Sequence, residues 1–200
     1  MNKVIIVGGG AAGMLASIIA AKNGCAVTLF EKNEKLGKKV YITGKGRCNV
    51  TNNCDPEELL QAVMSNQKFL YSAFYSFTSQ DMMQLLEDAG VPLKTERGNR
   101  VFPVSDHSSD IIHGLERLMK KYRVQIHLRS EVKNLLTENG IVTGIQLTDN
   151  KVYTADAVIV ATGGLSYPTT GSTGDGYRFA ADWPPERISA RPVFSPPVTS

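Results

Sequence analysis

The glycine-rich stretch at residues 4–13, Val-Ile-Ile-Val-Gly-Gly-Gly-Ala-Ala-Gly, constrains the fold of this chain more than any other segment. Its four consecutive β-branched apolar residues predict a strand that is buried on both faces. The glycines that complete a G-x-G-x-x-G motif follow this run: Gly8, Gly10 and Gly13. Residues 14–22 are compatible with a helix, and the apolar run at 26–30 ends at Glu31. This order predicts a βαβ unit and therefore an α/β fold with a parallel sheet.

The glycine motif also indicates a dinucleotide site. Gly8 permits a tight turn, Gly10 lets the backbone approach a diphosphate, and Gly13 lets the helix pack close to the strand. Unpaired N–H groups at the helix N-terminus attract the phosphate charge. Glu31 can accept hydrogen bonds from both hydroxyls of an adenosine ribose and disfavours a 2′-phosphate, so NAD or FAD is expected rather than NADP. The alternative is a plain glycine turn, which the flanking strands, helix and acid disfavour.

Composition is that of a globular protein, with 42% hydrophobic and 20% charged residues in a chain of 200. The net charge of +3, from 22 basic and 19 acidic residues, is too small to argue for a nucleic-acid partner. No apolar run approaches the roughly 18 residues that a membrane span requires, and glycines interrupt the N-terminal run, so no signal peptide is expected. Three cysteines without metal-ligand spacing suggest reduced thiols in a cytoplasmic protein: Cys25, Cys48 and Cys54.

The segment at 32–52 is polar, basic and rich in glycine, which predicts a long loop rather than a packed element. Long loops inside compact domains are commonly functional. Six cations lie in it: Lys32, Lys35, Lys38, Lys39, Lys45 and Arg47. For a single lysine, a solvated side chain is the more common outcome. Residues 44–47, Gly-Lys-Gly-Arg, favour an anion site, because glycines on both sides let backbone and side chain reach the ligand together.

The middle of the chain predicts helices followed by antiparallel strands. Residues 55–122 form a largely helical segment, interrupted by two short strands within 91–104. Residues 124–128 predict the third parallel strand, because they follow a helix that serves as the crossover. Residues 131–154 predict an antiparallel meander whose turns carry the strong hairpin signals Asn-Gly and Asp-Asn.

The last strand predicted is the fully apolar run at 157–161, which leads into Thr-Gly-Gly at 162–164. Such a strand brings backbone to the carboxyl edge of the sheet, where ligands bind in open α/β folds. A Gly/Ser/Thr-rich loop at 165–177 leads to a short helix at 178–182. Residues 183–200 are rich in proline and show no periodicity, so no element is expected there.

Four motifs occur in an order that resembles a family of bacterial flavoproteins. They are G-x-G-x-x-G with Glu31, T-G-K-G-R-C-N at 43–49, R-V-F-P-V-S at 100–105, and A-T-G-G-L-S-Y-P-T-T-G-S-T-G-D-G-Y at 161–177. The family comprises NAD(P)/FAD-dependent, aminoacetone-oxidase-like oxidoreductases and includes bile-acid-type enone reductases. The resemblance implies a Rossmann-like FAD-binding domain at 1–182, with a central parallel sheet and a β-meander.

By position, the resemblance also implies the residues that contact FAD. The glycine motif would seat the diphosphate, Glu31 would hold the ribose, and Val132 would meet the adenine through its backbone. Residues 44–49 would line the flavin side, and 161–163 would pack beside the cofactor. The full set is Gly8, Gly10, Ala11, Ala12, Gly13, Glu31, Lys32, Gly44, Gly46, Arg47, Cys48, Asn49, Val132, Ala161, Thr162 and Gly163.

Cys48 lies beside Arg47, a cation that would lower the pKa of its thiol. We interpret Cys48 as a packing or flavin-contact residue, and a disulfide with Cys54 is the alternative. The sequence contains no Ser/His/Asp arrangement and no metal cluster, so it identifies no catalytic residue.

Members of the family run to roughly twice this length, within the range of a two-domain chain. The resemblance fades at 183–200, which favours a truncated or frame-shifted product in which a second domain only begins. The function expected is flavin-mediated hydride transfer between NAD(P)H and a small organic substrate. One alternative is a non-catalytic half-domain that binds FAD or ADP, and another is an NAD-dependent dehydrogenase. Nucleic acid is a weaker prediction for the partner, because no aromatic residues interleave with the cations.

Overall fold

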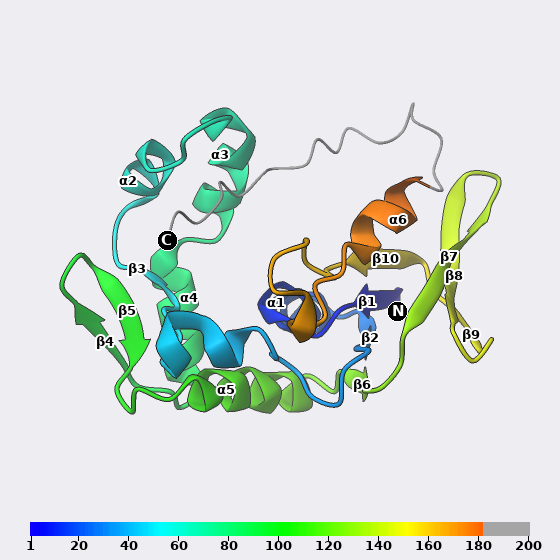
Figure 1. Cartoon of the computed structure of the whole chain (residues 1–200), viewed down its shortest axis with the longest axis horizontal. Coiled ribbons are helices and arrows are strands. Elements are labelled where there is room, and N and C mark those ends of the chain that lie inside the picture. The colour runs from blue at the N-terminus through cyan, green and yellow to red at the C-terminus, as the bar shows by residue number, and fades with distance from the viewer. Residues whose placement is uncertain (182–200) are drawn as a thin grey trace.

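A four-stranded parallel sheet lies at the centre of the computed structural model, which describes residues 1–181 (Figure 1). Its spatial order is β10-β1-β2-β6, and every neighbouring pair is parallel. The strands are β1 (Lys3–Val7), β2 (Ala26–Phe30), β6 (Gln125–His127) and β10 (Ala157–Val160). This sheet confirms the α/β fold and the three parallel strands predicted around the glycine motif. The proline-rich tail at 183–200 and the predicted boundary at 182 lie outside the described residues.

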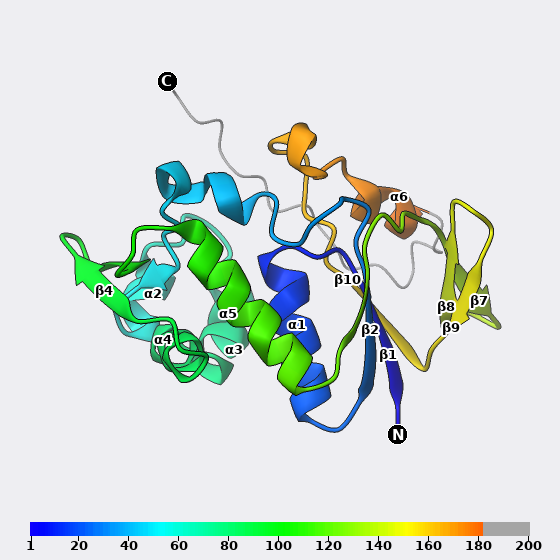
Figure 2. The same cartoon turned by 90° about the horizontal axis from the view of Figure 1, so that it is seen from below.

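Two helices cover one face of this sheet (Figure 2). They are α1 (Ala11–Lys22), which follows the glycine turn, and α5 (Ser108–Lys121), which leads into β6. Ile6 of β1, Met14 of α1 and Ile112 of α5 are almost fully buried in one apolar cluster. Burial of these side chains holds the helices against the sheet, because apolar surface removed from water stabilises the folded state.

The antiparallel meander predicted at 131–154 is present, and it covers the opposite face of the parallel sheet (Figure 2). Its strands are β7 (Val132–Glu138), β8 (Ile141–Leu147) and β9 (Val152–Thr154). Ile5 and Phe30 of the parallel sheet pack here against Ile145 of the meander and Phe179 of the short helix α6 (Asp175–Ala181). Successive residues of β1 thus face opposite layers. This alternation is the two-residue period of a strand, and here both faces of the strand are buried.

A smaller antiparallel sheet lies beside the main body, with strand order β3-β5-β4. Its strands are β3 (Thr51–Asn52), β4 (Leu93–Glu96) and β5 (Arg100–Pro103), of which the sequence predicted the last two. Three helices connect β3 to β4, as the helical pattern predicted: α2 (Pro56–Gln61), α3 (Gln67–Ser76) and α4 (Ser79–Asp88). Helix α4 begins with a capping box in which Thr78 and Asp81 each accept a hydrogen bond from the other's backbone amide.

The prediction of an unpacked loop at 32–52 is wrong. The segment contains the 3-10 helix η1 (Val40–Gly46) and strand β3, and three of its side chains belong to the main core. These side chains are Leu36, Val40 and Cys48. They pack with residues of α1 and α5, so contacts with distant elements, rather than local periodicity, order this segment.

The apolar run at 157–161 forms a strand, as predicted, but its composition is misleading about burial, because most of β10 is exposed. Strand β10 lies at the edge of the parallel sheet, and within residues 1–181 only β1 pairs with it. Ile159 and Val160 are 41% and 39% exposed, whereas Val158 packs against the meander cluster. An apolar run is typical of a central strand, but here one side of the strand has no partner among the described elements.

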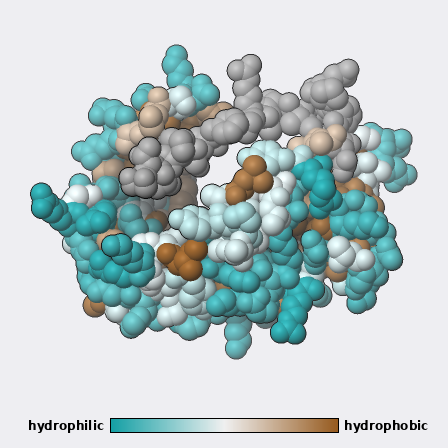
Figure 3. All heavy atoms as spheres, viewed as in Figure 1, coloured by the Kyte–Doolittle hydropathy of each residue, from teal (hydrophilic) through white to brown (hydrophobic). Residues whose placement is uncertain are grey.

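No helix within residues 1–181 is long and apolar enough to cross a membrane. The face shown in Figure 3 is mainly hydrophilic, with apolar side chains at scattered positions.

Candidate functional site

A cavity of about 310 Å³ opens at the carboxyl edge of the parallel sheet. Ligands bind at this edge in open α/β sheets. Ten of the residues expected to contact a cofactor line the cavity: Gly8, Gly10, Ala11, Ala12, Glu31, Lys32, Val132, Ala161, Thr162 and Gly163. The ends of β1, β2 and β10 and the start of β7 therefore place four separate stretches of sequence around one space.

The three motif glycines occupy different environments. Gly8 has φ +109°, and a Cβ there would lie 2.4 Å from the carbonyl oxygen of Ala161. A Cβ on Gly13 would lie 1.8 Å from the carbonyl oxygen of Gly8, so this glycine lets the helix sit directly against the turn. Around a Cβ on Gly10 there is nothing within 4 Å. The chain therefore leaves open space above Gly10, where a ligand can approach the backbone.

The N-terminus of α1 presents unpaired amides to this space. Gly10 is the N-cap residue and makes no side-chain capping hydrogen bond. Within the described part of the chain, no hydrogen bond occupies the amides of Gly10, Ala11 or Ala12, whereas the Met14 amide donates to the Gly10 carbonyl at 2.9 Å. Free N–H groups and the positive end of the helix dipole together form a site for an anion.

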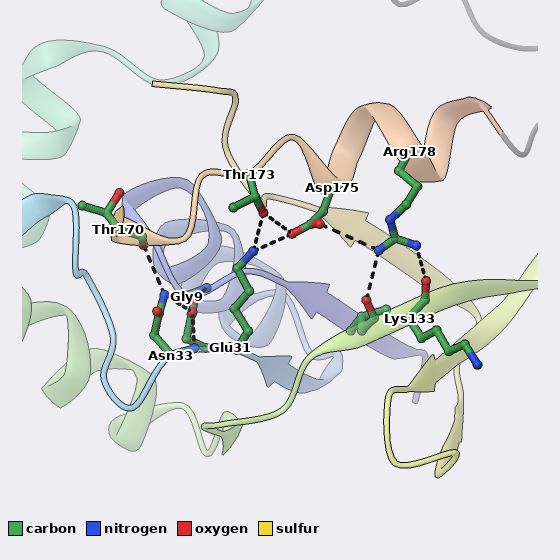
Figure 4. Close-up of polar contacts among 10 residues, drawn as sticks. Gly9, Glu31, Asn33, Lys133, Thr170, Thr173, Asp175 and Arg178 are labelled. Atoms are coloured by element: carbon green, nitrogen blue, oxygen red, sulfur yellow. Dashed lines mark hydrogen bonds and ion pairs between the residues drawn. The ribbon is translucent and has the colours of Figure 1, made fainter. Parts of the chain in front are cut away.

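Glu31 is buried, with 7% of its surface exposed, and its carboxylate is held in place by the chain (Figure 4). Its Oε2 accepts a hydrogen bond from the Gly9 amide at 2.6 Å. Its Oε1 accepts from the backbone amide of Asn33 at 2.8 Å and from the Asn33 side chain at 2.7 Å. Because an ionised carboxylate offers about four acceptor positions, Glu31 keeps capacity for a further donor at the cavity wall.

A polar network joins the walls of the cavity (Figure 4). Lys32 Nζ donates to Asp175 Oδ2 at 2.7 Å and to Thr173 Oγ1 at 2.6 Å, which connects the end of β2 to the start of α6. Asp175 Oδ1 lies 3.8 Å from Arg178 Nη2, and the Arg178 guanidinium donates to the carbonyls of Lys133 and Val132 in the meander.

The Asp175 carboxylate is a negative charge that the network stabilises. Its burial favours the neutral acid, but hydrogen bonds from Lys32 and Thr173, with the charge of Lys32 and Arg178, outweigh that effect and lower its pKa. Asp175 therefore stays ionised and holds Lys32 at the cavity wall.

The other six predicted residues do not line the cavity: Gly13, Gly44, Gly46, Arg47, Cys48 and Asn49. Arg47 donates to Glu96 Oε1 at 2.5 Å and to Asp106 Oδ1 at 2.6 Å, and it lies over the Phe102 ring at 4.1 Å. The anions that Arg47 meets are thus carboxylates of its own chain. From the T-G-K-G-R-C-N motif, Thr43 lines the cavity.

Cys48 packs in the main core, as one of its two predicted roles requires, but the lowering of its thiol pKa by Arg47 is not found. Burial raises the pKa of its thiol, and the hydrogen bond with Thr43 acts in the opposite direction without reversing the shift. The neighbouring Arg47 is engaged by carboxylates, so its charge does not activate the thiol. All three cysteines are free, which excludes the alternative of a disulfide between Cys48 and Cys54 in this structure.

Several cavity residues were absent from the sequence-based set, among them Asn33, Lys38, Lys39, Thr170, Ser172 and Phe179. Asn33, Lys38 and Lys39 lie in the segment that follows β2, and Thr170, Ser172 and Phe179 lie between the end of β10 and the end of α6. The topology supplies the signal that could have found them, because residues just beyond the carboxyl ends of parallel strands gather at one edge. No cluster of three or more His, Cys, Asp or Glu residues suited to a metal ion occurs within residues 1–181.

The glycine turn, the acid at the end of β2 and the parallel sheet define a Rossmann-type domain. Residues 2–186 match the family described as the HI0933-like protein Rossmann domain, and the chain belongs to this family.

Two curated relatives extend this comparison. The chain is 32% identical over 183 residues to a 3-dehydro-bile acid delta(4,6)-reductase from Clostridium scindens, covering 90% of this chain and 43% of that protein. It is 34% identical over 178 residues to a ribosomal RNA dihydrouridine synthase from Escherichia coli, covering 88% of this chain and 43% of that protein. The chain thus spans less than half the length of these curated relatives.

Among solved structures, a 3-ketosteroid-delta4-(5alpha)-dehydrogenase from Rhodococcus jostii resembles the fold, with a TM-score of 0.65 at 19% identity. The likeness covers 83% of this chain and 47% of that protein. At this level of identity the comparison supports the fold.

Proposed function

We propose that this chain binds FAD and serves a flavin-dependent oxidoreductase that transfers hydride between NAD(P)H and an organic substrate. The observation that carries the proposal is the meeting, in one cavity, of unpaired α1 amides, open space above Gly10 and the fixed carboxylate of Glu31. A bound flavin supplies the capacity to accept and donate hydride.

The residues of this cavity fit an adenine dinucleotide. The amides at the start of α1 would bind the diphosphate, because they combine free donors with the positive helix end. Glu31 would accept hydrogen bonds from the ribose hydroxyls with its remaining acceptor capacity. Val132, which lines the same cavity from β7, would meet the adenine. The buried anionic carboxylate beside the ribose position would repel a 2′-phosphate, which supports FAD over an NADP-type ligand.

The first experiment identifies the cofactor. The protein is purified and denatured, and the released ligand is identified by absorbance and mass. We expect FAD, or uptake of added FAD by the colourless protein. A protein that carries no flavin and takes none up, but binds NAD, would favour the alternative of an NAD-dependent dehydrogenase.

A substitution of Glu31 tests whether FAD binds in this cavity. Glu31→Gln replaces one acceptor oxygen by an NH₂ group facing the donors of Gly9 and Asn33, so we expect FAD affinity to fall by about tenfold or more. Glu138→Gln, a matched change at an exposed position at the end of β7, should leave FAD affinity unchanged. Equal affinities for both variants would contradict the placement of the ribose at Glu31.

Turnover is a separate question, because a half-domain can bind FAD without catalysing a reaction. Measurement of NAD(P)H oxidation by the FAD-loaded chain, with each nicotinamide in turn, distinguishes the two possibilities. FAD binding without turnover supports the non-catalytic half-domain. Turnover by the 200-residue chain supports the complete hydride-transfer function.

A second candidate concerns the substrate. The name of the Clostridium scindens relative refers to a bile acid, and that of the Escherichia coli relative refers to ribosomal RNA. The second name opposes the expectation that a small molecule, rather than nucleic acid, is the partner. Parallel assays of the loaded protein with an unsaturated 3-oxo steroid acid and with unmodified ribosomal RNA test both, the readouts being NAD(P)H oxidation and nucleoside mass.

A further inference from the structure

The loop at 32–47 carries six cations, and the structure gives most of them a partner. Lys32 pairs with Asp175 at 2.7 Å and Lys38 with Glu34 at 3.4 Å. Arg47 pairs with Glu96 and Asp106, as described above. Lys35 lies over the ring of Tyr41 at 4.2 Å and is exposed at the surface, and Lys45 is exposed and does not line the cavity.

Lys39 differs from the other five in its partners. Like Lys32 and Lys38, it lines the cavity and is partly buried. Its Nζ donates to the carbonyl oxygen of Ser166 at 2.7 Å and lies 3.3 Å from the Ser166 hydroxyl. Within residues 1–181 no carboxylate forms an ion pair with it. Lys39 is therefore the loop cation that faces the cavity with its charge uncompensated.

A partly buried cation without a carboxylate partner favours the binding of an anion beside it. Burial alone lowers the pKa of Lys39, since no negative group opposes the loss of solvation. The carbonyl of Ser166 accepts a hydrogen bond from one of the three N–H donors of Lys39, and the remaining donors can bind a ligand. The unpaired amides of α1 line the same cavity and attract the same kind of group.

We propose that Lys39 is the cationic ligand of the diphosphate in the bound dinucleotide, acting together with the N-terminal amides of α1. This assignment rests on the proposed FAD function and deepens it. The sequence favoured residues 44–47, Gly-Lys-Gly-Arg, as the anion site, and the proposal gives this role to Lys39 instead. A charge-assisted hydrogen bond to a phosphate oxygen is stronger than a bond between neutral groups, so its loss is measurable as affinity.

The test compares three ligands on three variants of the full chain. Lys39→Met removes the charge and keeps an apolar stem, Lys39→Arg keeps the charge, and Lys35→Met removes a loop cation outside the cavity. FAD and ADP carry the diphosphate, and adenosine lacks it. Dissociation constants come from calorimetric titration for FAD and ADP and from ligand-observed NMR for adenosine.

We expect Lys39→Met to weaken both FAD and ADP by about tenfold or more, while adenosine binding stays unchanged. Lys39→Arg should recover most of the affinity, and Lys35→Met should match the original protein. If Lys39→Met weakened the binding of adenosine as much as that of FAD and ADP, the role of Lys39 would be merely structural. If it weakened the binding of FAD but not of ADP, the charge of Lys39 would act on the flavin part. Either result overturns the proposal. If the original chain binds neither FAD nor ADP, the proposed function itself fails, which is distinguishable from a failure confined to Lys39.

Discussion

Two glycines of one motif give opposite predictions at the scale of single residues. A Cβ on Gly13 would collide with the backbone carbonyl of Gly8, which no side-chain movement relieves. We expect Gly13→Ala to lower the free energy of unfolding by more than about 2 kcal/mol. Gly10→Ala meets no atom within 4 Å and has an ordinary negative φ, so its stability should stay close to that of the original chain.

Gly10→Ala should nevertheless lower the affinity for FAD, although it leaves stability unchanged. The Cβ of Gly10→Ala occupies the space through which a diphosphate approaches the helix, so FAD affinity should fall although the fold is intact. Urea unfolding and FAD titration of both variants provide the measurements. A Gly10→Ala protein that binds FAD as tightly as the original would place the ligand away from this turn.

Cys48 provides a second prediction at this scale. Its thiol is buried in the core and its raised pKa disfavours the reactive thiolate. In the native protein at pH 8, a thiol reagent such as dithionitrobenzoate should leave Cys48 unmodified, whereas unfolding in guanidinium should expose it. Peptide mass mapping after timed labelling identifies the residue. Rapid native labelling of Cys48 would show that the segment at 40–48 opens readily.

At the scale of elements, an ion-pair network attaches the β4–β5 hairpin to the segment around η1. Asp106 accepts from Lys94 at 2.7 Å and from Arg47, and Glu96 accepts from Arg47. Hydrogen bonds from Lys94 and then Arg47 lower the pKa of Asp106, and the bond from Arg47 lowers that of Glu96. Both carboxylates are therefore stabilised in their charged form in the folded protein.

The sign of the pH effect follows from these lowered pKa values. The contribution of the network is present above the unfolded-state pKa values, near 4, and is lost as the pH falls through the lower folded-state values. Between about pH 5 and pH 3, Tm should therefore fall, and it should fall less in Asp106→Asn, which has lost one of the two groups. Asp55→Asn, at an N-cap whose side chain makes no capping hydrogen bond, is the control. Identical acid profiles for Asp106→Asn and the original chain would refute the role of the network.

A second network fixes helix α6 against the cavity. Asp175→Asn leaves Lys32 without its ionic partner and weakens the link through Arg178 to the meander. We expect the free energy of unfolding to fall by about 1–3 kcal/mol, because the lost bond is charge-assisted and partly buried. Hydrogen exchange should increase in α6 and around Val132, and ADP affinity should fall with FAD affinity.

The matched control for Asp175 is Asp149→Asn, which removes an exposed pair with Lys151 at 2.9 Å. Exposed pairs contribute little to stability, so Asp149→Asn should leave both exchange and affinity unchanged. A similar response of the two variants would mean that Asp175 acts only as a surface charge.

At the scale of the whole molecule, local sequence patterns predicted the main elements of the fold. They did not predict the contacts between segments that are far apart in the sequence. The glycine turn and the meander were correctly predicted, because each is specified by neighbours in sequence. The edge position of β10 was not predicted, because an apolar composition does not indicate whether a strand has neighbours on one side or on both. Contacts such as Lys32 with Asp175 and Asn33 with Thr170 join residues 143 and 137 positions apart, so the pattern of neighbouring residues could not identify these pairs.

Because the cavity walls come from distant parts of the sequence, a bound ligand should affect the stability of the whole domain. The cavity walls come from the glycine turn, the segment after β2, the first residues of the meander and the segment after β10. A dinucleotide that contacts all four walls binds only when they are assembled, so it should stabilise the whole domain. At a free concentration a hundred times Kd, the gain is about 2.7 kcal/mol, which corresponds to a rise in Tm of about 5–10 °C for a chain of this size.

Thermal unfolding with FAD, ADP and adenosine measures this effect on the complete chain. FAD and ADP should each raise Tm as their concentration increases, and hydrogen exchange should slow in β1, α1, β7 and α6 together. This follows because the ligand shifts a single equilibrium between assembled and opened walls. Protection confined to the glycine turn, with Tm unchanged at saturating ligand, would mean that the walls do not act as one unit.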